Sequence, residues 1–206
     1  MMRLYYCDVL APRKACSVAK YLKAPVEFIY LDLTRNEHAT PAMLAINPNG
    51  KVPTLVDGEL TIWEADAVMC HLSARMGADL WPHDARQQLE VISWFSWNMA
   101  HFTGRSAGAL YFEYIIKARF GIGAPDPPVV EEALGEFRRC AAILNTHLKG
   151  RNWLLGEALT VADFSVAITL PYASQASLPL DEFPELLRWH EQLNAFEAWR
   201  EPFPIR

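Results

Sequence analysis

The sequence has no long apolar run and no excess of positive charge. No stretch approaches 18 uninterrupted apolar residues, and the first residues contain no apolar signal segment, so we expect neither a membrane span nor secretion. The formal net charge is -5, with 19 Lys and Arg against 24 Asp and Glu, whereas nucleic-acid surfaces are normally basic. The sequence therefore indicates a cytoplasmic protein without membrane or nucleic-acid partners.

Closely spaced cysteine pairs are also missing. The four cysteines are widely scattered and form no Cys-x-x-Cys motif; they are Cys7, Cys16, Cys70 and Cys140. This spacing argues against a metal site and against a dithiol redox motif. Disulfides are not expected in a reducing compartment. We therefore expect no bound metal.

The sequence pattern changes near residue 80. Up to about Arg75, short β-rich runs alternate with helical patterns, which is typical of a small α/β unit. From Ala85 to Arg200 the pattern is helical, and no internal repeat or low-complexity tract is present. The sequence predicts an α/β domain over residues 1–77, a linker over 78–84 and an all-helical domain over 85–206.

The segment from Asn47 to Leu55 contains the strongest local signals. Asn-Pro and Asn-Gly are turn dipeptides, so the chain turns here and then extends. Pro53 interrupts the following strand because it cannot donate to a ladder. One solution is a cis Val52-Pro53 bond that leaves the N–H and C=O of Val52 free for an extended peptide ligand. The alternative is a trans proline at a strand start.

A hairpin and a helix follow this turn. Asp57-Gly58 is a hairpin signal between two short strands, and the second strand leads into an apolar-periodic helix beginning at Glu64. Helix N-termini bind anions, although a Glu in this position can simply complement the helix dipole. Farther along, Thr160 and Asp163 form a Thr-x-x-Asp pattern that predicts a capping box.

The run NPNGKVPTL, the hairpin and the run WEADAV together resemble the glutathione-binding half of the cytosolic glutathione S-transferases. His38, the second residue of the pair Glu37-His38, lies nine residues before Asn47, as in theta-like members of the family. The resemblance extends from about residue 3 to residue 195. It implies a thioredoxin-like domain followed by a helical bundle, glutathione as co-substrate, and a two-fold homodimer to which the Trp-rich helix would contribute.

The same resemblance assigns glutathione-binding residues. Val52 and Pro53 would present the backbone, while Glu64 and the N–H of Ala65 would hold the γ-glutamyl end. The family usually has Ser where this chain has Ala65, so one hydrogen bond worth about 1.5–3 kcal/mol is lost. Three further residues complete the predicted site. Asp66 either fixes the amino end or merely occupies the first helical turn, and the glycyl carboxylate would be held by His38 and Lys51.

The position of the thiol-activating residue departs from the family pattern. The family places a Tyr, Ser or Cys after the first strand, whereas the matching residues here are Val9 and Leu10. Neither side chain can donate a hydrogen bond. We expect the amides at the start of the next helix to contribute, because helix termini and cations lower thiol pKa values. Arg13 and Cys7 are the candidate catalytic residues, although Cys7 could instead be a small buried residue.

A pocket for the second substrate would lie between the domains. Trp97, His101 and Arg105 fall on one stripe of the long helix. With Val9 and Leu10 they would favour a small hydrophobic electrophile. Such a stripe is equally consistent with a core or a subunit interface.

The sequence thus predicts a glutathione transferase that conjugates the glutathione thiolate to a hydrophobic electrophile. Two alternatives stay open. One is a non-catalytic interaction module of the same fold, which the apolar catalytic position favours. The other is a glutathione-dependent disulfide reductase or peroxidase, which an exposed, reactive Cys7 would favour.

Overall fold

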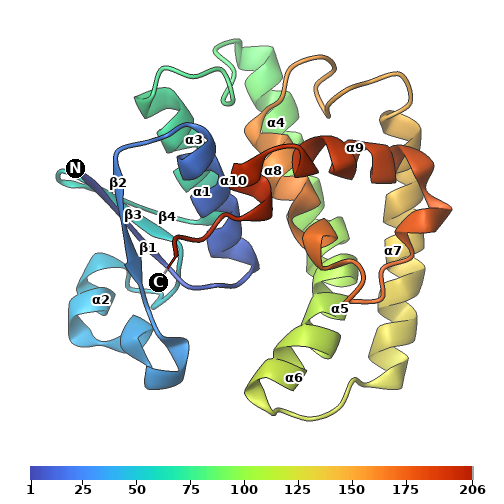
Figure 1. Cartoon of the computed structure of the whole chain (residues 1–206), viewed down its shortest axis with the longest axis horizontal. Helices are drawn as coiled ribbons and strands as arrows, with labels where there is room; N and C mark the ends of the chain where they lie inside the picture. Colours follow the sequence, from blue (N-terminus) through green and yellow to red (C-terminus); the bar gives the residue numbers. More distant parts are fainter. Residues whose placement is uncertain (206) are drawn as a thin grey trace. The chain divides into compact units, whose positions relative to one another are not determined.

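The structure, a computed structural model, describes residues 1–205 and divides into two compact units (Figure 1). The first comprises Met1–Trp81 together with the segment from Phe196 onward, and the second comprises Pro82–Ala195. The predicted helical domain extended to residue 206, whereas the segment from Phe196 belongs with the first unit. No helix among the described residues is both long and apolar enough to cross a membrane.

The first unit contains a four-stranded sheet in the order β2-β1-β3-β4. Its strands are β1 (Met2–Tyr6), β2 (Val26–Tyr30), β3 (Thr54–Asp57) and β4 (Leu60–Trp63). Strand β1 is parallel to β2 and antiparallel to β3, and β3 and β4 form the predicted hairpin. The parallel pair requires a crossover, which the helix between β1 and β2 supplies. This is the predicted thioredoxin-like arrangement.

Helices cover both faces of this sheet. The helices are α1 (Leu10–Tyr21), α2 (Pro41–Ile46), α3 (Ala65–Arg75) and α10 (Glu197–Arg200), and the short 3-10 turns are η1 (Leu33–Arg35) and η2 (Glu37–Ala39). Met43 of α2 packs against Tyr5 and Val56. Because side chains alternate along a strand, the fully buried Leu4 and Leu55 face the other side, where α1 and α3 contact each other and the sheet.

A 3-10 turn, η1, begins shortly after strand β2. The side chain of Asp32 accepts a hydrogen bond from the backbone N–H of Thr34 at 2.9 Å, which caps the 3-10 turn η1. An Asp that bonds the backbone two residues ahead favours a turn over continued extension. The strand therefore ends at Tyr30.

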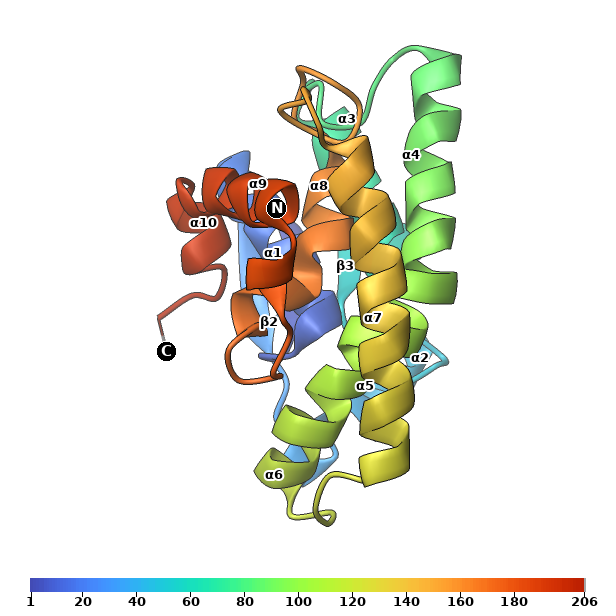
Figure 2. The same cartoon turned by 90° about the vertical axis from the view of Figure 1, so that its right-hand side faces the viewer.

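The second unit is helical. Its elements are α4 (Ala85–Trp97), η3 (Asn98–Ala107), α5 (Gly108–Tyr111), η4 (Phe112–Ile116), α6 (Lys117–Phe120), α7 (Pro127–His147), α8 (Val161–Val166), η5 (Ala167–Tyr172), η6 (Leu180–Glu182) and α9 (Pro184–Asn194). Figure 2 shows α7 alongside the continuous helical run from α4 to α6, and α7 contacts η3 and α5. Phe102 and Phe137 stack in the core between them.

The helix predicted from Ala85 to about Lys117 is not uniformly α-helical. Segments η3 and η4 are π-helical, with backbone hydrogen bonds that reach five residues back. Asn98 is fully buried at the start of η3, where its side-chain amide donates to the carbonyl of Ser165 at 3.1 Å. Its carbonyl accepts from the hydroxyl of Thr103, five residues ahead, at 2.7 Å. Helical periodicity in the sequence does not predict this contact between Asn98 and Ser165.

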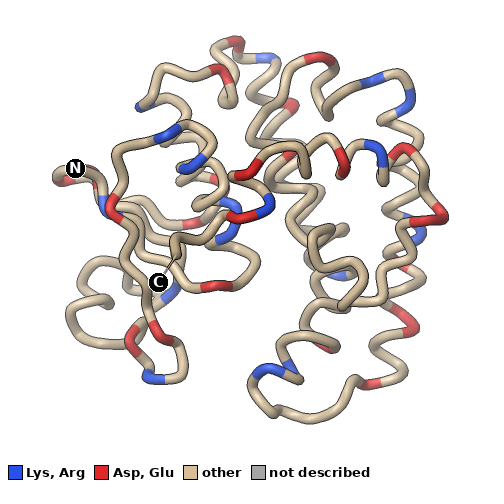
Figure 3. Tube along the Cα trace, in the orientation of Figure 1, with Lys and Arg blue, Asp and Glu red and all other residues tan. Residues whose placement is uncertain are grey.

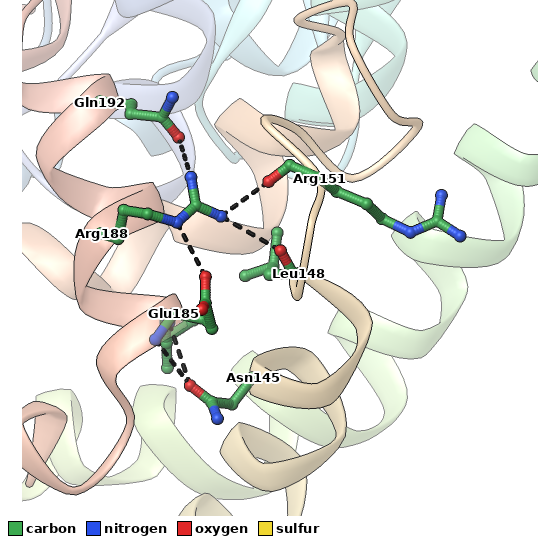
Figure 4. A network of polar contacts seen from close by, with 7 residues as sticks. Asn145, Leu148, Arg151, Glu185, Arg188 and Gln192 are labelled. Atoms are coloured by element: carbon green, nitrogen blue, oxygen red, sulfur yellow. Dashed lines mark hydrogen bonds and ion pairs between the residues drawn. The ribbon is translucent and has the colours of Figure 1, made fainter.

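A polar network fixes the end of α7 against α9 (Figure 4). Arg188 donates to the backbone carbonyls of Leu148 and Arg151, at 3.1 and 2.7 Å. The side-chain oxygen of Asn145 accepts from the backbone N–H of Glu185 at 2.8 Å, so α7 caps the start of α9. The network holds the loop that precedes α8.

The predicted capping box at the start of α8 is confirmed. The hydroxyl and backbone N–H of Thr160 both donate to Asp163, and Asp163 is fully buried. Figure 3 shows the positions of Lys and Arg interspersed with those of Asp and Glu along the backbone of both units.

Candidate functional site

The loop after α2 is organised by the side chain of Asn47. Its amide donates to the carbonyl of Lys51 at 2.9 Å and to the hydroxyl of Thr54 at 3.0 Å, and its oxygen accepts from the N–H of Asn49 at 3.0 Å. Asn47 is 1% exposed. Gly50 adopts φ +57, a conformation that L side chains rarely take. Asn47 thus shapes the loop that carries Lys51, a role that the turn signals alone did not reveal.

The predicted cis peptide between Val52 and Pro53 is present. Pairing of β3 with β1 extends only from Thr54 to Val56. Within residues 1–205, the backbone N–H and C=O of Val52 form no hydrogen bond. They are available to an extended ligand.

Glu64 does not begin α3 as a helical residue but precedes it with φ 71 and ψ 123. A non-glycine residue in this region is strained, and such strain concentrates at functional sites. Helix α3 starts at Ala65, so its first amides have no partner within the helix. They form a positive helix terminus of the kind that binds anions.

These residues share one cleft. A cavity of about 210 Å³ is lined by Ala11, Asn47, Lys51, Val52, Pro53, Glu64 and Ala65. It brings together five of the predicted glutathione-binding residues. The cleft offers a cation, a carboxylate, free backbone groups and a helix terminus. This set complements a short peptide that carries both an ammonium and carboxylates.

The start of α1 supplies the wall at Ala11. Val9 precedes the helix without a side-chain cap, so the amides of Leu10 and Ala11 have no partner within the helix. Pro12 has no N–H, and the next amide, of Arg13, donates to the carbonyl of Val9 at 3.1 Å. Two backbone donors therefore stand where the side chains of Val9 and Leu10 offer none.

The two candidate catalytic residues do not line this cleft. Arg13 is buried, donates to the backbone carbonyl of Trp199 and lies over the Trp199 ring, with 5.5 Å from its guanidinium carbon to the ring centroid. Cys7 is 1% exposed at the end of β1. Both positions are those of structural residues, Arg13 as the anchor of the C-terminal segment.

His38 and Asp66 lie beside the cleft but not on its lining. The carbonyl of His38 would be 3.3 Å from a Cβ at Gly50, so η2 packs directly on the loop. Its Nδ1 is buried with no hydrogen-bond partner within residues 1–205. Asp66 accepts from the ammonium of Lys14 at 3.0 Å.

The remaining predicted residues belong to the helical unit. Trp97 packs edge to face on Trp94 and stacks on Phe102, with centroid distances of 5.4 and 5.7 Å. His101 and Arg105 are exposed. A cleft of about 250 Å³ is lined by Arg105, Ala109, Val129, Glu132 and Ala133. Trp97 thus packs on the buried Phe102, and its ring centroid also lies 6.4 Å from that of His101.

Among residues 1–205, no group of three or more His, Cys, Asp or Glu side chains is placed to hold a metal ion. Burial raises the pKa of the Cys70 thiol to about 12, with a smaller contribution from the Asp66 carboxylate. Cys70 is therefore a neutral thiol at physiological pH.

Comparison with known proteins identifies the fold and family. The profile for the glutathione S-transferase N-terminal domain matches residues 5–74, and that for the C-terminal domain matches residues 127–192. Glutathione S-transferase 3 of Zea mays is 31% identical over 182 residues, which are 84% of this chain and 80% of that protein.

Two solved structures share the fold. Glutathione S-transferase I bound with lactoylglutathione has a TM-score of 0.87 at 21% identity, over 98% of this chain and 97% of that one. The maize enzyme I in complex with an atrazine glutathione conjugate also has a TM-score of 0.87 at 21% identity, over 98% and 95%. With the two profiles and the maize relative, these matches show that the chain belongs to the glutathione S-transferase family.

Proposed function

We propose that this protein binds glutathione in the 210 Å³ cleft of the first unit and conjugates its thiolate to a small hydrophobic electrophile. The observation that carries the proposal is the convergence of Val52, Glu64 and Ala65 on one cleft. The free backbone of Val52 would pair with the cysteinyl backbone. The start of α3 would hold the γ-glutamyl carboxylate, and the Glu64 carboxylate would hold its ammonium. Lys51 would hold the glycyl carboxylate, with His38 packed behind its loop.

The thiolate would be stabilised by the backbone amides of Leu10 and Ala11. Amides at a helix N-terminus lower a thiol pKa without a side-chain hydroxyl. On ionisation the thiol proton goes to water. The sulfur lone pair then forms the S–C bond, and the electrophile's leaving group departs with the electrons of the bond that breaks. In the neighbouring maize structure the bound product is an atrazine conjugate, which supports an apolar second substrate.

A non-catalytic role is the second candidate, and one observation favours it. Val9 and Leu10 occupy the positions where the family carries its hydroxyl or thiol, so any thiol activation rests on backbone donors. An exposed Cys7 would favour the reductase or peroxidase alternative, whereas Cys7 is 1% exposed. We therefore do not pursue that alternative.

We further propose that the protein forms a homodimer in the cytoplasm. Leu89, Ile92 and Met99 are spaced along α4 and η3 and are 64%, 47% and 57% exposed, which is costly for a free helix face. The four cysteines are all free, as expected in a reducing compartment. Sedimentation of the wild type and of Ile92→Glu would test the interface, since a charge at a two-fold contact is present twice.

Titration of glutathione into the purified protein tests the main proposal. Calorimetry reports binding, and ultraviolet absorbance of the thiolate across pH reports the thiol pKa. A bound thiol with a pKa well below about 8.5 supports conjugation. Binding with an ordinary thiol pKa would favour the non-catalytic role. Absence of binding at millimolar glutathione would refute both the assignment of the glutathione site and the proposed enzyme activity.

A further inference from the structure

Lys14 is an unusual residue of the first unit because it is buried with its charge paired. Its side chain is 6% exposed, and its ammonium donates to Asp66 at 3.0 Å. Burying a charged group costs free energy, and a hydrogen-bonded partner of opposite charge offsets part of that cost. The pair joins the first turns of two helices, because Lys14 lies on α1 and Asp66 on α3.

Both partners of the pair are close in sequence to residues that line the cleft. Ala11, which lines the cleft, precedes Lys14 by three residues and so shares its helical face. Ala65, on the opposite wall, immediately precedes Asp66. Each partner is thus adjacent to a wall residue, one on each of the two helices.

The charge of Asp66 matters for an incoming ligand. A carboxylate in the first turn of a helix interacts with the same positive terminus that would bind a ligand anion. It would also repel a ligand carboxylate placed there. A cation that cancels this charge keeps the terminus attractive to anions.

We propose that Lys14 is a positioning residue for glutathione, which neutralises Asp66 and thereby allows the start of α3 to hold the γ-glutamyl carboxylate. The inference rests on the proposed function, because it concerns the same cleft. It assigns Asp66 a role different from binding the ligand's ammonium. The positive end of α3 would then attract the ligand carboxylate without opposition from the Asp66 charge.

Charge variants separate this role from simple packing. Calorimetry would measure the glutathione dissociation constant for wild type, Lys14→Met, Asp66→Asn and the double variant. We expect Lys14→Met to weaken binding about tenfold, because the Asp66 charge is then unbalanced. Asp66→Asn should not weaken binding, and the double variant should return to within about threefold of wild type. A purely structural pair would weaken binding in all three variants, which would overturn the inference.

A truncated ligand identifies the group that feels this charge. The probe is γ-aminobutyryl-cysteinyl-glycine, which is glutathione without the α-carboxylate of its γ-glutamyl group and which keeps the ammonium. Wild type and Lys14→Met should bind this probe with equal affinity. Equal weakening of both ligands by Lys14→Met would contradict the proposal. Lys20→Met is the matched control, since Lys20 lies near the other end of α1 and donates to the carbonyls of Glu201 and Phe203.

The outcomes for the two proposals are distinct. Wild type that binds no glutathione overturns the proposed function and this inference together. Wild type that binds glutathione while Lys14→Met binds it equally well overturns this inference alone. Should Lys14→Met fail to fold, Asp66→Asn decides the matter, because it keeps the shape and removes the charge, and a loss of affinity beyond about threefold would refute the charge-balancing role.

Discussion

Trp189 donates its indole N–H to Asp163 Oδ1 at 3.0 Å, and the backbone N–H of Leu154 donates to the same oxygen at 2.9 Å. The other oxygen accepts from Thr160. One buried carboxylate therefore joins α8, α9 and the loop before α8. Each oxygen of the Asp163 carboxylate accepts two hydrogen bonds.

Asp163→Asn should destabilise the helical unit strongly. An amide retains one acceptor oxygen and turns its NH2 group toward groups that are themselves donors, so buried donors lose their partners. We expect a loss of about 3 kcal/mol in the free energy of unfolding, measured by urea denaturation. Asp181→Asn, on the exposed turn η6, is the matched control and should change stability by less than about 0.5 kcal/mol. Similar midpoints for the two variants would contradict the role of the network.

The same residue makes stability depend on pH. Burial raises the pKa of Asp163 from an ordinary value of 3.8 to about 6. The hydrogen bonds to its carboxylate lower the pKa but do not outweigh burial. The native state therefore binds a proton that the unfolded state releases. The resulting stabilisation is complete below the unfolded pKa and is lost as the pH rises through the folded pKa.

We therefore expect the free energy of unfolding to fall between pH 4.5 and 6, relative to Asp163→Asn measured in parallel. The carboxyls with lowered pKa values, such as those of Glu113 and Glu182, act in the opposite direction and titrate below their ordinary 4.5. Equal pH slopes for wild type and the Asn variant across this window would refute the assignment.

Ala65→Ser should strengthen glutathione binding. Ala65 lines the cleft at the first position of α3, where a hydroxyl can donate to the carboxylate that the free amides would hold. A hydrogen bond to a charged group is worth about 1.5–3 kcal/mol, so affinity should rise about tenfold or more in calorimetry. Ala74→Ser, on an exposed turn of the same helix, should leave affinity unchanged. A gain in both variants would point to a general effect on α3.

Arg13→Met should loosen the C-terminal segment. The guanidinium donates to the carbonyl of Trp199 and lies over its ring, and Trp199 is fully buried. Loss of this charged hydrogen bond and contact should cost about 2–4 kcal/mol of stability. It should also speed proteolysis after Ala195, measured by mass spectrometry. Arg86→Met, whose side chain is 90% exposed, provides the control. An unchanged proteolysis rate in Arg13→Met would show that other contacts hold the segment.

Gly104→Ala should be destabilising because η3 brings the carbonyl of Met99 against the position of a new Cβ. Overpacking of this kind costs about 1–3 kcal/mol. Gly135→Ala is a helical control with nothing within 4 Å of the new Cβ, and it should stabilise the protein by about 0.5–1 kcal/mol. Thermal denaturation of both variants would show shifts of opposite sign. Stabilisation of both would indicate that residues 98–107 form an ordinary α-helix.

Local signals in the sequence predicted the features that depend on neighbouring residues. The hairpin at Asp57-Gly58, the cis bond before Pro53 and the Thr160–Asp163 box are each defined within a few positions, and all three are confirmed. The resemblance added the family, and five of the residues that it implies for glutathione binding are among those that line the cleft.

Contacts between distant residues were not predictable in the same way. Lys14 and Asp66 are 52 positions apart, and Arg13 and Trp199 are 186 apart. Nothing in either local pattern names its partner, since a cation on a helix is usually solvated. The π-helical turns of η3 likewise depend on the anchor from Asn98 to Ser165, which lies on another helix.

The return of the chain to the first unit has a consequence for biosynthesis. Domains generally fold as they emerge from the ribosome, N-terminal first. Here α1 receives Trp199 and the carbonyls that bind Lys20 only after the entire helical unit has been translated. The first unit, most of which is translated before the helical unit, is therefore completed last. Until then the nascent chain exposes the surface that Trp199 covers.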